Sequence, residues 1–191
     1  MFDDLYLSES RDRSIQWARR LLAERNFVIL DTETTGLNGL DQIVEIAVVD
    51  ANGKLLLRQF VNPTVQISEG AEAVHSISKA MVKEAPAFKQ IIEPLLALIA
   101  GKIVVTYNAT FDIRMIKQSA WAHKVEIDLT QAVSWDCAME AYAAYYGDYN
   151  AYRGSFRWQK LIGGDHSALG DCMATLALIK RMAEDKLTVE K

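Results

Sequence analysis

The sequence has few of the residues that build covalent cross-links or membrane segments. Its two cysteines, Cys137 and Cys172, lie far apart and form neither a CxxC pair nor a Cys/His cluster. We therefore expect no disulfide framework and no structural zinc site, and a reducing compartment suits the chain. No apolar run approaches the length of a membrane span, and the opening segment MFDDLYLSESRDRS lacks the basic-then-apolar order of a signal peptide. These absences predict a cytoplasmic protein without a membrane partner.

Basic residues are also in the minority. The chain has 21 Lys and Arg against 25 Asp and Glu, which gives a formal net charge of -4. Proteins held to nucleic acid by bulk electrostatics usually carry a positive surface, so a nucleic-acid function here would need cations or local basic patches. With 191 residues, 50% of them hydrophobic, the chain is long enough for one domain with a substantial core.

Apolar periodicity predicts an α/β fold. Short apolar runs with strand character are followed by longer stretches whose apolar residues recur at helical spacing. The predicted strands cover residues 27–31, 42–50, 54–61 and 102–107. The predicted helices cover residues 14–26, 79–84, 87–100, 111–123, 136–146 and 167–185. This order indicates a central mixed sheet flanked by helices, with an extra N-terminal helix.

Four acidic residues stand where the predicted elements could bring them together. Asp31 and Glu33 close the first strand two residues apart, so their side chains point to the same face. Asp112 follows the fourth strand, and Asp171 lies on the apolar stripe of the last helix. Like charges in one cleft disfavour each other's ionised forms unless a positive charge compensates them. Oxygen-only ligands favour Mg²⁺ or Mn²⁺, and we expect two divalent cations.

A histidine accompanies this acidic group. His166 lies five residues before Asp171, at the start of the last helix. A single histidine at a helix start is usually a capping or surface residue. Next to a metal cluster, however, its imidazole is placed to act as a general base.

These motifs resemble those of a known family. The segments Asp31-Thr-Glu33, YNATFD around Asp112 and HSALGD from His166 to Asp171 are similar to the three motifs of the DEDDh 3′-to-5′ exonucleases, which include the proofreading subunit of bacterial DNA polymerase III and ribonuclease T. The segment AVHSIS resembles the family's VHGI segment. The resemblance implies an exonuclease domain over residues 27–185, between an N-terminal helical extension, residues 1–26, and a tail, residues 186–191.

The resemblance also implies a fold and a chemistry. The fold would be ribonuclease H-like, with a mixed five-stranded sheet. Asp31, Glu33 and Asp171 would hold one metal, Asp31 and Asp112 would hold or support the second, and His166 would be the general base. An in-line attack would release nucleoside 5′-monophosphates from a 3′ end.

Further residues are candidates for contact with the terminal nucleotide. The loop after the first strand should approach it, and the second motif carries tyrosine where family members often carry histidine. His75 could reach the sugar or make a structural hydrogen bond, and both readings stay open. The candidate substrate-binding residues are Thr34, Gly36, Leu37, His75, Tyr107, Asn108 and Phe111.

Three more features have a structural and a functional interpretation. We expect Glu45 to be a hydrogen-bonded structural residue, and Asp136 to cap its helix. The loop GDYNAYRGSFRW mixes aromatic and basic residues, so it could follow a phosphate backbone, or its aromatics could pack beneath it. Arg114 and Lys117 are further candidates for phosphate contact.

The sequence leaves several functional alternatives open. It cannot separate a DNA exonuclease from an exoribonuclease, because recognition of the 2′-hydroxyl depends on pocket geometry. An inactive binding module is less consistent, because all five motif residues are present. The expected partners are a single-stranded nucleic-acid 3′ end and a DNA polymerase or repair protein.

Overall fold

One mixed β-sheet forms the centre of the protein. The computed structural model describes residues 4–188, and the sheet has five strands in the order β3-β2-β1-β4-β5. Strand β1 is antiparallel to β2 and parallel to β4. The strands are β1 (Phe27–Thr34), β2 (Ile43–Asp50), β3 (Leu55–Phe60), β4 (Ile103–Thr106) and β5 (Ser134–Cys137), and a separate hairpin pairs β6 (Tyr149–Asn150) with β7 (Ser155–Phe156).

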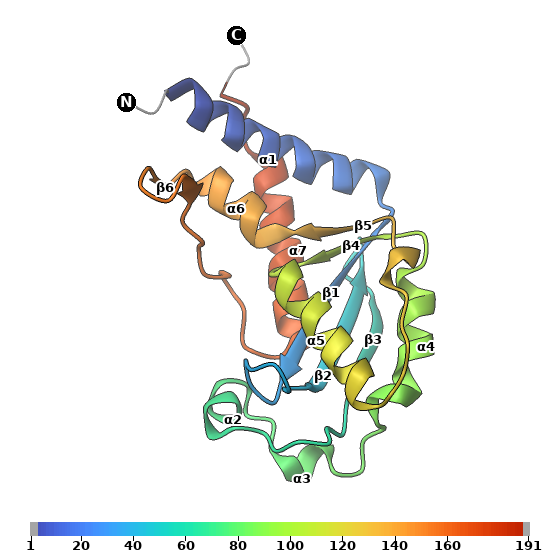
Figure 1. The fold of residues 1–191 in the computed structure, drawn as a ribbon. Helices are drawn as coiled ribbons and strands as arrows, with labels where there is room; N and C mark the ends of the chain where they lie inside the picture. Colours follow the sequence, from blue (N-terminus) through green and yellow to red (C-terminus); the bar gives the residue numbers. More distant parts are fainter. Residues whose placement is uncertain (1–3, 189–191) are drawn as a thin grey trace.

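Helices cover both faces of this sheet (Figure 1). The helices are α1 (Asp4–Glu24), α2 (Glu69–His75), α3 (Lys79–Val82), α4 (Phe88–Ile99), α5 (Ala109–Ala122), α6 (Ala138–Tyr146) and α7 (Ala168–Glu184), with a 3₁₀ turn, η1 (Leu129–Gln131). None of the helices within residues 4–188 is long and apolar enough to cross a bilayer.

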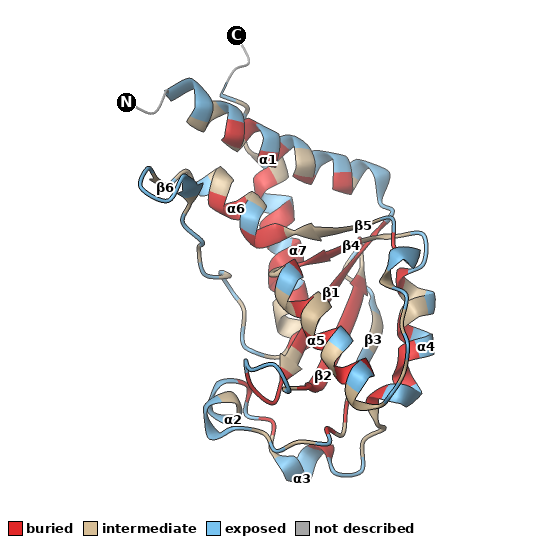
Figure 2. Cartoon of the chain, in the orientation of Figure 1, coloured by how far each residue is buried: buried red, intermediate tan, exposed pale blue. Residues whose placement is uncertain are grey.

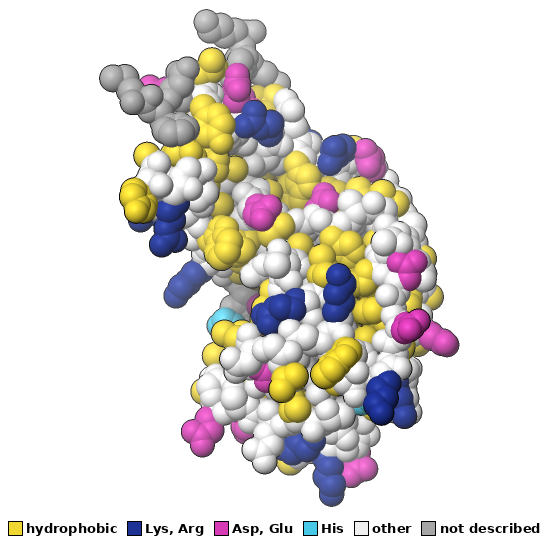
Figure 3. All heavy atoms as spheres, in the orientation of Figure 1, with side chains coloured by type: hydrophobic (Ala, Val, Ile, Leu, Met, Phe, Trp, Pro, Cys, Tyr) yellow, Lys and Arg dark blue, Asp and Glu magenta, His cyan; other side chains and the backbone are white. Residues whose placement is uncertain are grey.

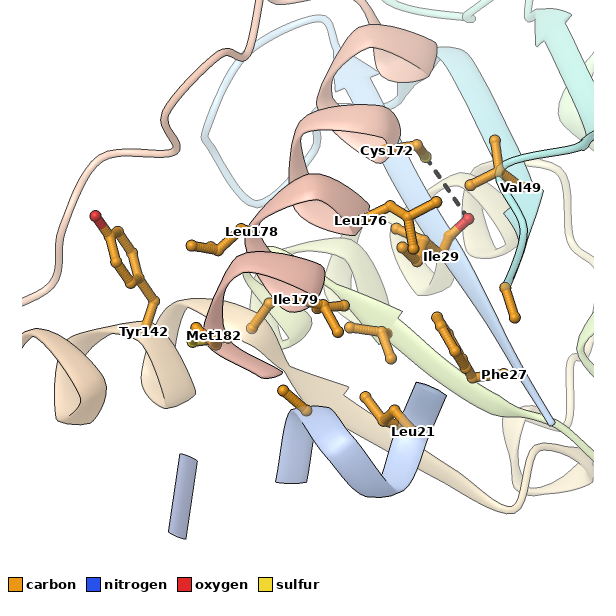
Figure 4. Close-up of a cluster of buried hydrophobic side chains, with 14 of the residues drawn as sticks. Leu21, Phe27, Ile29, Val49, Tyr142, Cys172, Leu176, Leu178, Ile179 and Met182 are labelled. Atoms are coloured by element: carbon orange, nitrogen blue, oxygen red, sulfur yellow. Dashed lines mark hydrogen bonds between the residues drawn. The ribbon is translucent and has the colours of Figure 1, made fainter. Parts of the chain in front are cut away.

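Alternating residues of β1 feed two separate layers of the core. Phe27 and Ile29 pack with α1, α6 and α7, whereas Val28 and Leu30 pack with α4 and α5. This division follows from the strand geometry, in which successive side chains point to opposite faces. Figure 2 shows buried residues along the central strands and on the sheet-facing sides of the helices. Figure 4 shows the first layer, where side chains of α7 lie against Ile29.

The predicted strands and the predicted fold class are confirmed, with corrections at particular elements. Helix α1 begins at Asp4 and not at residue 14, because polar positions such as Ser10 and Asp12 are buried against the domain and gave no apolar signal. Helix α2 lies between the predicted strand 54–61 and the predicted helix 79–84, where the apolar pattern indicates no element. The domain boundaries remain predictions, and residues 189–191 of the proposed tail lie outside the described part.

The fifth strand was not located from the sequence. Strand β5 has only four residues, all half-buried, so it shows no apolar run. The predicted capping role of Asp136 is wrong, because Asp136 lies inside β5 and Cys137 is the residue that precedes α6. Asp136 instead accepts hydrogen bonds from the Trp17 indole at 2.8 Å and the Ser134 hydroxyl at 2.8 Å. It therefore joins α1 to the edge of the sheet.

Helix α1 is fastened to the end of α7. The guanidinium of Arg11 bonds to the Asp185 carboxylate, and Arg19 donates to the carbonyl oxygens of Ala183 and Asp185 at 3.0 and 2.8 Å. The hydroxyl of Tyr145 on α6 donates to Asp185 at 2.7 Å. Three helices therefore meet at one carboxylate.

Candidate active site

Three of the predicted acids meet at the end of β1. Asp31 and Glu33 come from that strand and Asp171 from the first turn of α7, and each offers an oxygen within 4.8 Å of the others. Asp112, from the first turn of α5, is 2% exposed and accepts a hydrogen bond from the Thr32 hydroxyl at 2.8 Å. The four acids and His166 line one cleft of about 450 Å³. The structure thus brings together all five predicted catalytic residues.

The start of α7 is built around the Asp171 carboxylate. The backbone N–H groups of Asp165 and His166 donate to Asp171 Oδ1 at 3.0 and 3.2 Å. A Cβ atom on Gly164 would lie 2.7 Å from the same oxygen, so glycine is needed for this close approach. His166 has a φ of 59°, a left-handed conformation that non-glycine residues rarely adopt. The strained turn therefore holds both Asp171 and the candidate base in place.

Glu45 lies beside the acidic cluster but is not one of the three clustered acids, Asp31, Glu33 and Asp171. It lies directly opposite Glu33 in the β1–β2 pair and is 1% exposed. Its Oε1 accepts from Arg58 Nε at 2.8 Å and its Oε2 from the backbone N–H of Ala168 at 3.0 Å. The predicted hydrogen-bonded role of Glu45 is confirmed, because both carboxylate oxygens are used to join β3 to the start of α7.

The acidic residues lack sufficient compensating charge from the protein. Burial, followed by the carboxylates of Asp112 and Asp171, raises the pKa of Asp31 well above its usual range. Burial and Asp171 raise the pKa of Glu33 to about 8, and burial raises the pKa of Asp112 to about 7. Burial also raises the pKa of Asp171, although its backbone hydrogen bonds act in the opposite direction. A cluster of carboxylate oxygens that lacks compensating positive charge fits a hard divalent cation such as Mg²⁺ or Mn²⁺.

The raised pKa values predict that the cation-free protein loses stability as the pH rises. Each carboxyl has a higher pKa in the folded protein than in the unfolded chain, so the folded state binds more protons between the two values. For Glu33 this window runs from 4.5 to about 8. In EDTA we expect a Tm at about pH 8 that is lower by at least roughly 4 °C than the Tm at about pH 5.

Thermal unfolding with and without Mg²⁺ measures this effect. Mg²⁺ should raise the Tm mainly at the higher pH, because it binds the folded state and replaces the missing charge. Glu33→Gln should reduce the pH dependence in EDTA, since the amide does not titrate. A Tm in EDTA that rises from pH 5 to pH 8, or an unchanged pH dependence in Glu33→Gln, would contradict the explanation.

A second cavity adjoins the acidic cleft. It has a volume of about 490 Å³ and shares Thr32, Glu33 and Phe111 with the cleft. The predicted nucleotide contacts Thr34, Gly36, Leu37 and His75 also line it. Leu37 is 74% exposed, which leaves its side chain available to a ligand. The predicted substrate-binding residues are therefore divided between two adjoining spaces, one acidic and one mainly apolar.

Helix α5 fixes the loop that carries Leu37. Arg114 donates to the carbonyl oxygens of Leu37 and Asn38 at 3.3 and 3.4 Å, and its guanidinium lies 5.3 Å from the centre of the Phe111 ring. Gln118 donates to Asn38 and Asp41 at 3.0 and 2.9 Å. Arg114 therefore stabilises the conformation of this loop. Its contacts do not support the predicted role in phosphate binding, which stays a prediction.

His75 makes structural hydrogen bonds, which is one of the two roles that the sequence allowed. The backbone N–H of Ile77 donates to Nδ1 at 3.0 Å, so the proton of the neutral ring resides on Nε2. Nε2 then donates to the carbonyl oxygen of Thr34 at 3.0 Å. Both ring nitrogens are engaged with the backbone, and the imidazole ties α2 to the end of β1.

Tyr107 joins β4 to the segment that leads to His166. Its hydroxyl donates to the carbonyl oxygen of Gln159 at 2.6 Å, and burial raises its pKa to about 12. The ring lines the acidic cleft together with Asn108 and Phe111. The hydroxyl is thus engaged within the protein, and it remains a donor at neutral pH.

Loss of the Tyr107 hydroxyl should loosen this segment. Tyr107→Phe keeps the ring but removes the hydrogen bond to Gln159, so we expect trypsin to cleave after the exposed residues Arg157 and Lys160 several times faster. Mass spectrometry of the early fragments measures the sites. Tyr145→Phe is the matched control, because this hydroxyl, near the end of α6, bonds to Asp185 and not to the segment before His166. Equal cleavage rates in the two variants would contradict this role of Tyr107.

Some residues that shape the site had no signal in the sequence. Thr32, Asp165 and Gly164 act through contacts with Asp112, Ser167 and Asp171. Thr32 lies between the two acids of β1, and Gly164 and Asp165 directly precede His166 in a glycine-rich turn. Proximity to a motif was the one available indication.

A mixed sheet with carboxylates clustered at the end of its central strand, and a histidine in the same cleft, is the arrangement of a ribonuclease H-like nuclease. The sequence profile of the exonuclease family RNase_T matches residues 28–179. The chain therefore belongs to the DEDDh family of 3′-to-5′ exonucleases, and the resemblance based on the three motifs is confirmed.

Known proteins with similar sequences include exonucleases and polymerase subunits. An uncharacterized exonuclease, CP81, of Escherichia phage 186 is 36% identical over 177 residues, which cover 84% of this chain and 90% of that protein. A PolC-type DNA polymerase III of Caldanaerobacter subterraneus subsp. tengcongensis is 31% identical over 84% of this chain, but the match spans only 12% of the polymerase.

Solved structures agree with the fold. Exonuclease X, in complex with 5′ overhanging duplex DNA, is 29% identical, with a TM-score of 0.55 over 84% of this chain and 95% of that one. The nuclease domain of 3′hExo, a DEDDh family member bound to rAMP, has a TM-score of 0.64 over 84% of this chain and 92% of that one. Its identity of 16% supports the fold alone.

Proposed function

We propose that this protein uses two divalent cations, Mg²⁺ or Mn²⁺, to remove nucleoside 5′-monophosphates from the 3′ ends of DNA. The observation that carries the proposal is the meeting of the Asp31, Glu33 and Asp171 oxygens within 4.8 Å. His166 lines the same cleft. Clustered carboxylates of this kind bind the cations that stabilise phosphoryl-transfer transition states.

The chain's residues would divide the work as follows. Asp31, Glu33 and Asp171 would hold one cation, and Asp31 with Asp112 the second; when bound, these cations neutralise the charge that develops on the phosphate. An imidazole nitrogen of His166 accepts the proton of the attacking water. The Thr32 hydroxyl orients the Asp112 carboxylate.

The terminal nucleotide would occupy the cavity beside the acids. Thr34, Gly36 and Leu37 surround its base and sugar, and Phe111 lies between this cavity and the cleft. This arrangement positions the last phosphodiester at the acids. Asn108 and the Tyr107 ring line the side from which the rest of the strand enters.

Two of the named proteins favour DNA as the substrate, whereas 3′hExo, which was bound to rAMP, is similar in fold alone. The polymerase relative is a DNA polymerase, and exonuclease X was solved with duplex DNA. A DNA polymerase or a repair protein is accordingly the partner that we propose. The match to the phage exonuclease spans 90% of that protein, so the relatives include an exonuclease of similar length as well as a polymerase.

Digestion of matched strands tests the proposal. With Mg²⁺ and a 5′ label, single-stranded DNA should give a ladder of products shortened from the 3′ end, and chromatography should identify 5′-monophosphates. We expect RNA of the same sequence to be cut at least about tenfold more slowly, a difference of about 1.4 kcal/mol. Faster digestion of RNA would make the protein an exoribonuclease, and digestion in excess EDTA would contradict the role of the cations.

A further inference from the structure

The N-terminal helix is joined to the β6–β7 hairpin by aromatic contacts. The Tyr6 ring of α1 is stacked on Phe156, with ring centres 6.2 Å apart and an interplanar angle of 7°. It also meets the edge of Tyr149, with ring centres 5.8 Å apart. Helix α1 lies before the residues that match the exonuclease family profile, so this support is an addition to the family domain.

The aromatic residues of the hairpin fall into two groups. Tyr149 and Phe156 pack against each other, with ring centres 5.1 Å apart, and against Tyr6. Tyr152 is 98% exposed and Trp158 is 69% exposed. The aromatic residues that pack beneath the loop are therefore different from those that it exposes to solvent.

A groove of about 600 Å³ lies between this hairpin, α1 and α6. Its walls include Arg153, Arg157, Trp158, Asn150 and Glu140. Both arginines are exposed, and the guanidinium of Arg157 forms a solvent-exposed ion pair with Asp148, at 3.5 Å. Such surface pairs contribute little, so a phosphate can replace the carboxylate at low cost. Figure 3 shows Lys and Arg side chains along the side of the molecule that carries the hairpin.

The groove and the acidic cleft share one continuous segment of chain. Arg157 and Trp158 line the groove, and Lys160 and Leu161 line the cleft. Between them, the carbonyl oxygen of Gln159 is held by the Tyr107 hydroxyl. A strand whose 3′ end reaches the acids therefore has a continuous wall to follow toward the hairpin.

We propose that α1 and the β6–β7 hairpin form an auxiliary site for the single-stranded nucleic acid that lies upstream of the 3′ end. Arg153 and Arg157 bind phosphates, and Trp158 stacks on a base. Tyr6 is a positioning residue that fixes the hairpin. The inference rests on the proposed function, because the strand that it binds is the exonuclease substrate.

Strand length separates this site from the catalytic cleft. A dinucleotide occupies only the cleft, whereas a strand of about 12 nucleotides can also reach the hairpin. Fluorescence anisotropy in EDTA measures binding of the longer strand without digestion, and steady-state digestion with Mg²⁺ measures kcat/KM for both substrates. The variants are Tyr6→Ala, Arg153→Ala, Arg157→Ala and Trp158→Ala, with Arg20→Ala as the control for an exposed arginine of α1.

The site predicts losses that are confined to the longer strand. Trp158→Ala should weaken its binding about fivefold or more, as expected for a lost base stack. Each arginine variant should also reduce the slope of log affinity against log salt concentration by about one, the value expected for one lost phosphate contact. Tyr6→Ala should lose affinity like the arginine variants, and Arg20→Ala should match the wild type. Digestion of the dinucleotide should be unchanged throughout.

Other outcomes would overturn the proposal or a part of it. Wild-type affinity in all hairpin variants, or an equal loss on the dinucleotide, rules out an auxiliary site. Wild-type affinity in Tyr6→Ala alone rules out the role of α1. If the wild type binds the longer strand through the hairpin but digests nothing, the proposed function fails and the auxiliary site stands.

Discussion

Replacing Asp31 with asparagine should reduce Mg²⁺-dependent digestion at least about a thousandfold, because a lost metal contact removes several kcal/mol of transition-state stabilisation. Asparagine keeps the size of the side chain but lacks the charge that holds a cation. The same change should raise the Tm of the cation-free protein at about pH 8, since burial and neighbouring acids oppose ionisation of Asp31. Loss of activity together with a gain in stability distinguishes a functional acid from a structural one.

Asp50→Asn is the matched control for this substitution. Asp50 lies at the other end of the β1–β2 pair, opposite Val28, and accepts hydrogen bonds from the backbone of Asn52 and Lys54 at 2.8 and 2.9 Å. Its replacement should leave digestion within about twofold of the wild type, because it does not line the cleft. Near-normal turnover in Asp31→Asn would exclude the proposed arrangement of cations.

Closed circles of single-stranded DNA should resist the enzyme, with a rate at least about a hundredfold below that of the linear strand. The cavity beside the acids is bounded by the Leu37 loop and by α2, and Arg114 and Gln118 hold that loop in place. A free end can enter such a space, whereas a continuous backbone cannot place its phosphate at the acids. The measurement compares a circle with the same strand after linearisation.

The time course of the products gives a second check. If only ends are attacked, the circle should neither shrink nor become linear while the linear strand is consumed. Linear molecules that accumulate from the circle would show endonuclease cleavage. Glycine substitution of Leu37 is a useful companion, because its exposed side chain should affect the KM for ends more than the integrity of the fold.

The acids could be predicted from the sequence because each follows an element with a clear pattern. Asp31 and Glu33 end an apolar strand, and Asp171 interrupts the apolar stripe of a long helix. Contacts between residues remote in sequence could not be predicted in this way. The partner of Tyr107, for example, is the carbonyl oxygen of Gln159, and a main-chain oxygen leaves no mark on the sequence.

The misassigned elements share a physical cause. Strand β5 is short and half-buried, and the early part of α1 buries serine and aspartate, so neither shows the apolar periodicity on which the prediction depends. Their stability comes from tertiary contacts such as the Trp17 to Asp136 hydrogen bond. Periodicity reports burial of apolar side chains, and it fails where polar groups are buried with partners.

The docking of α1 against α7 also has a consequence for synthesis of the chain. Ala18 and Leu21 pack with Leu178, Ile179 and Met182, which are translated long after them. At 5–20 residues per second, the ribosome needs on the order of ten seconds to supply that surface after α1 has emerged. The β2–β3 hairpin can pair locally during this interval. The apolar side chains of α1 that pack against α7 stay exposed until α7 has been synthesised. Helix α1 is thus synthesised well before α7, the helix that covers it.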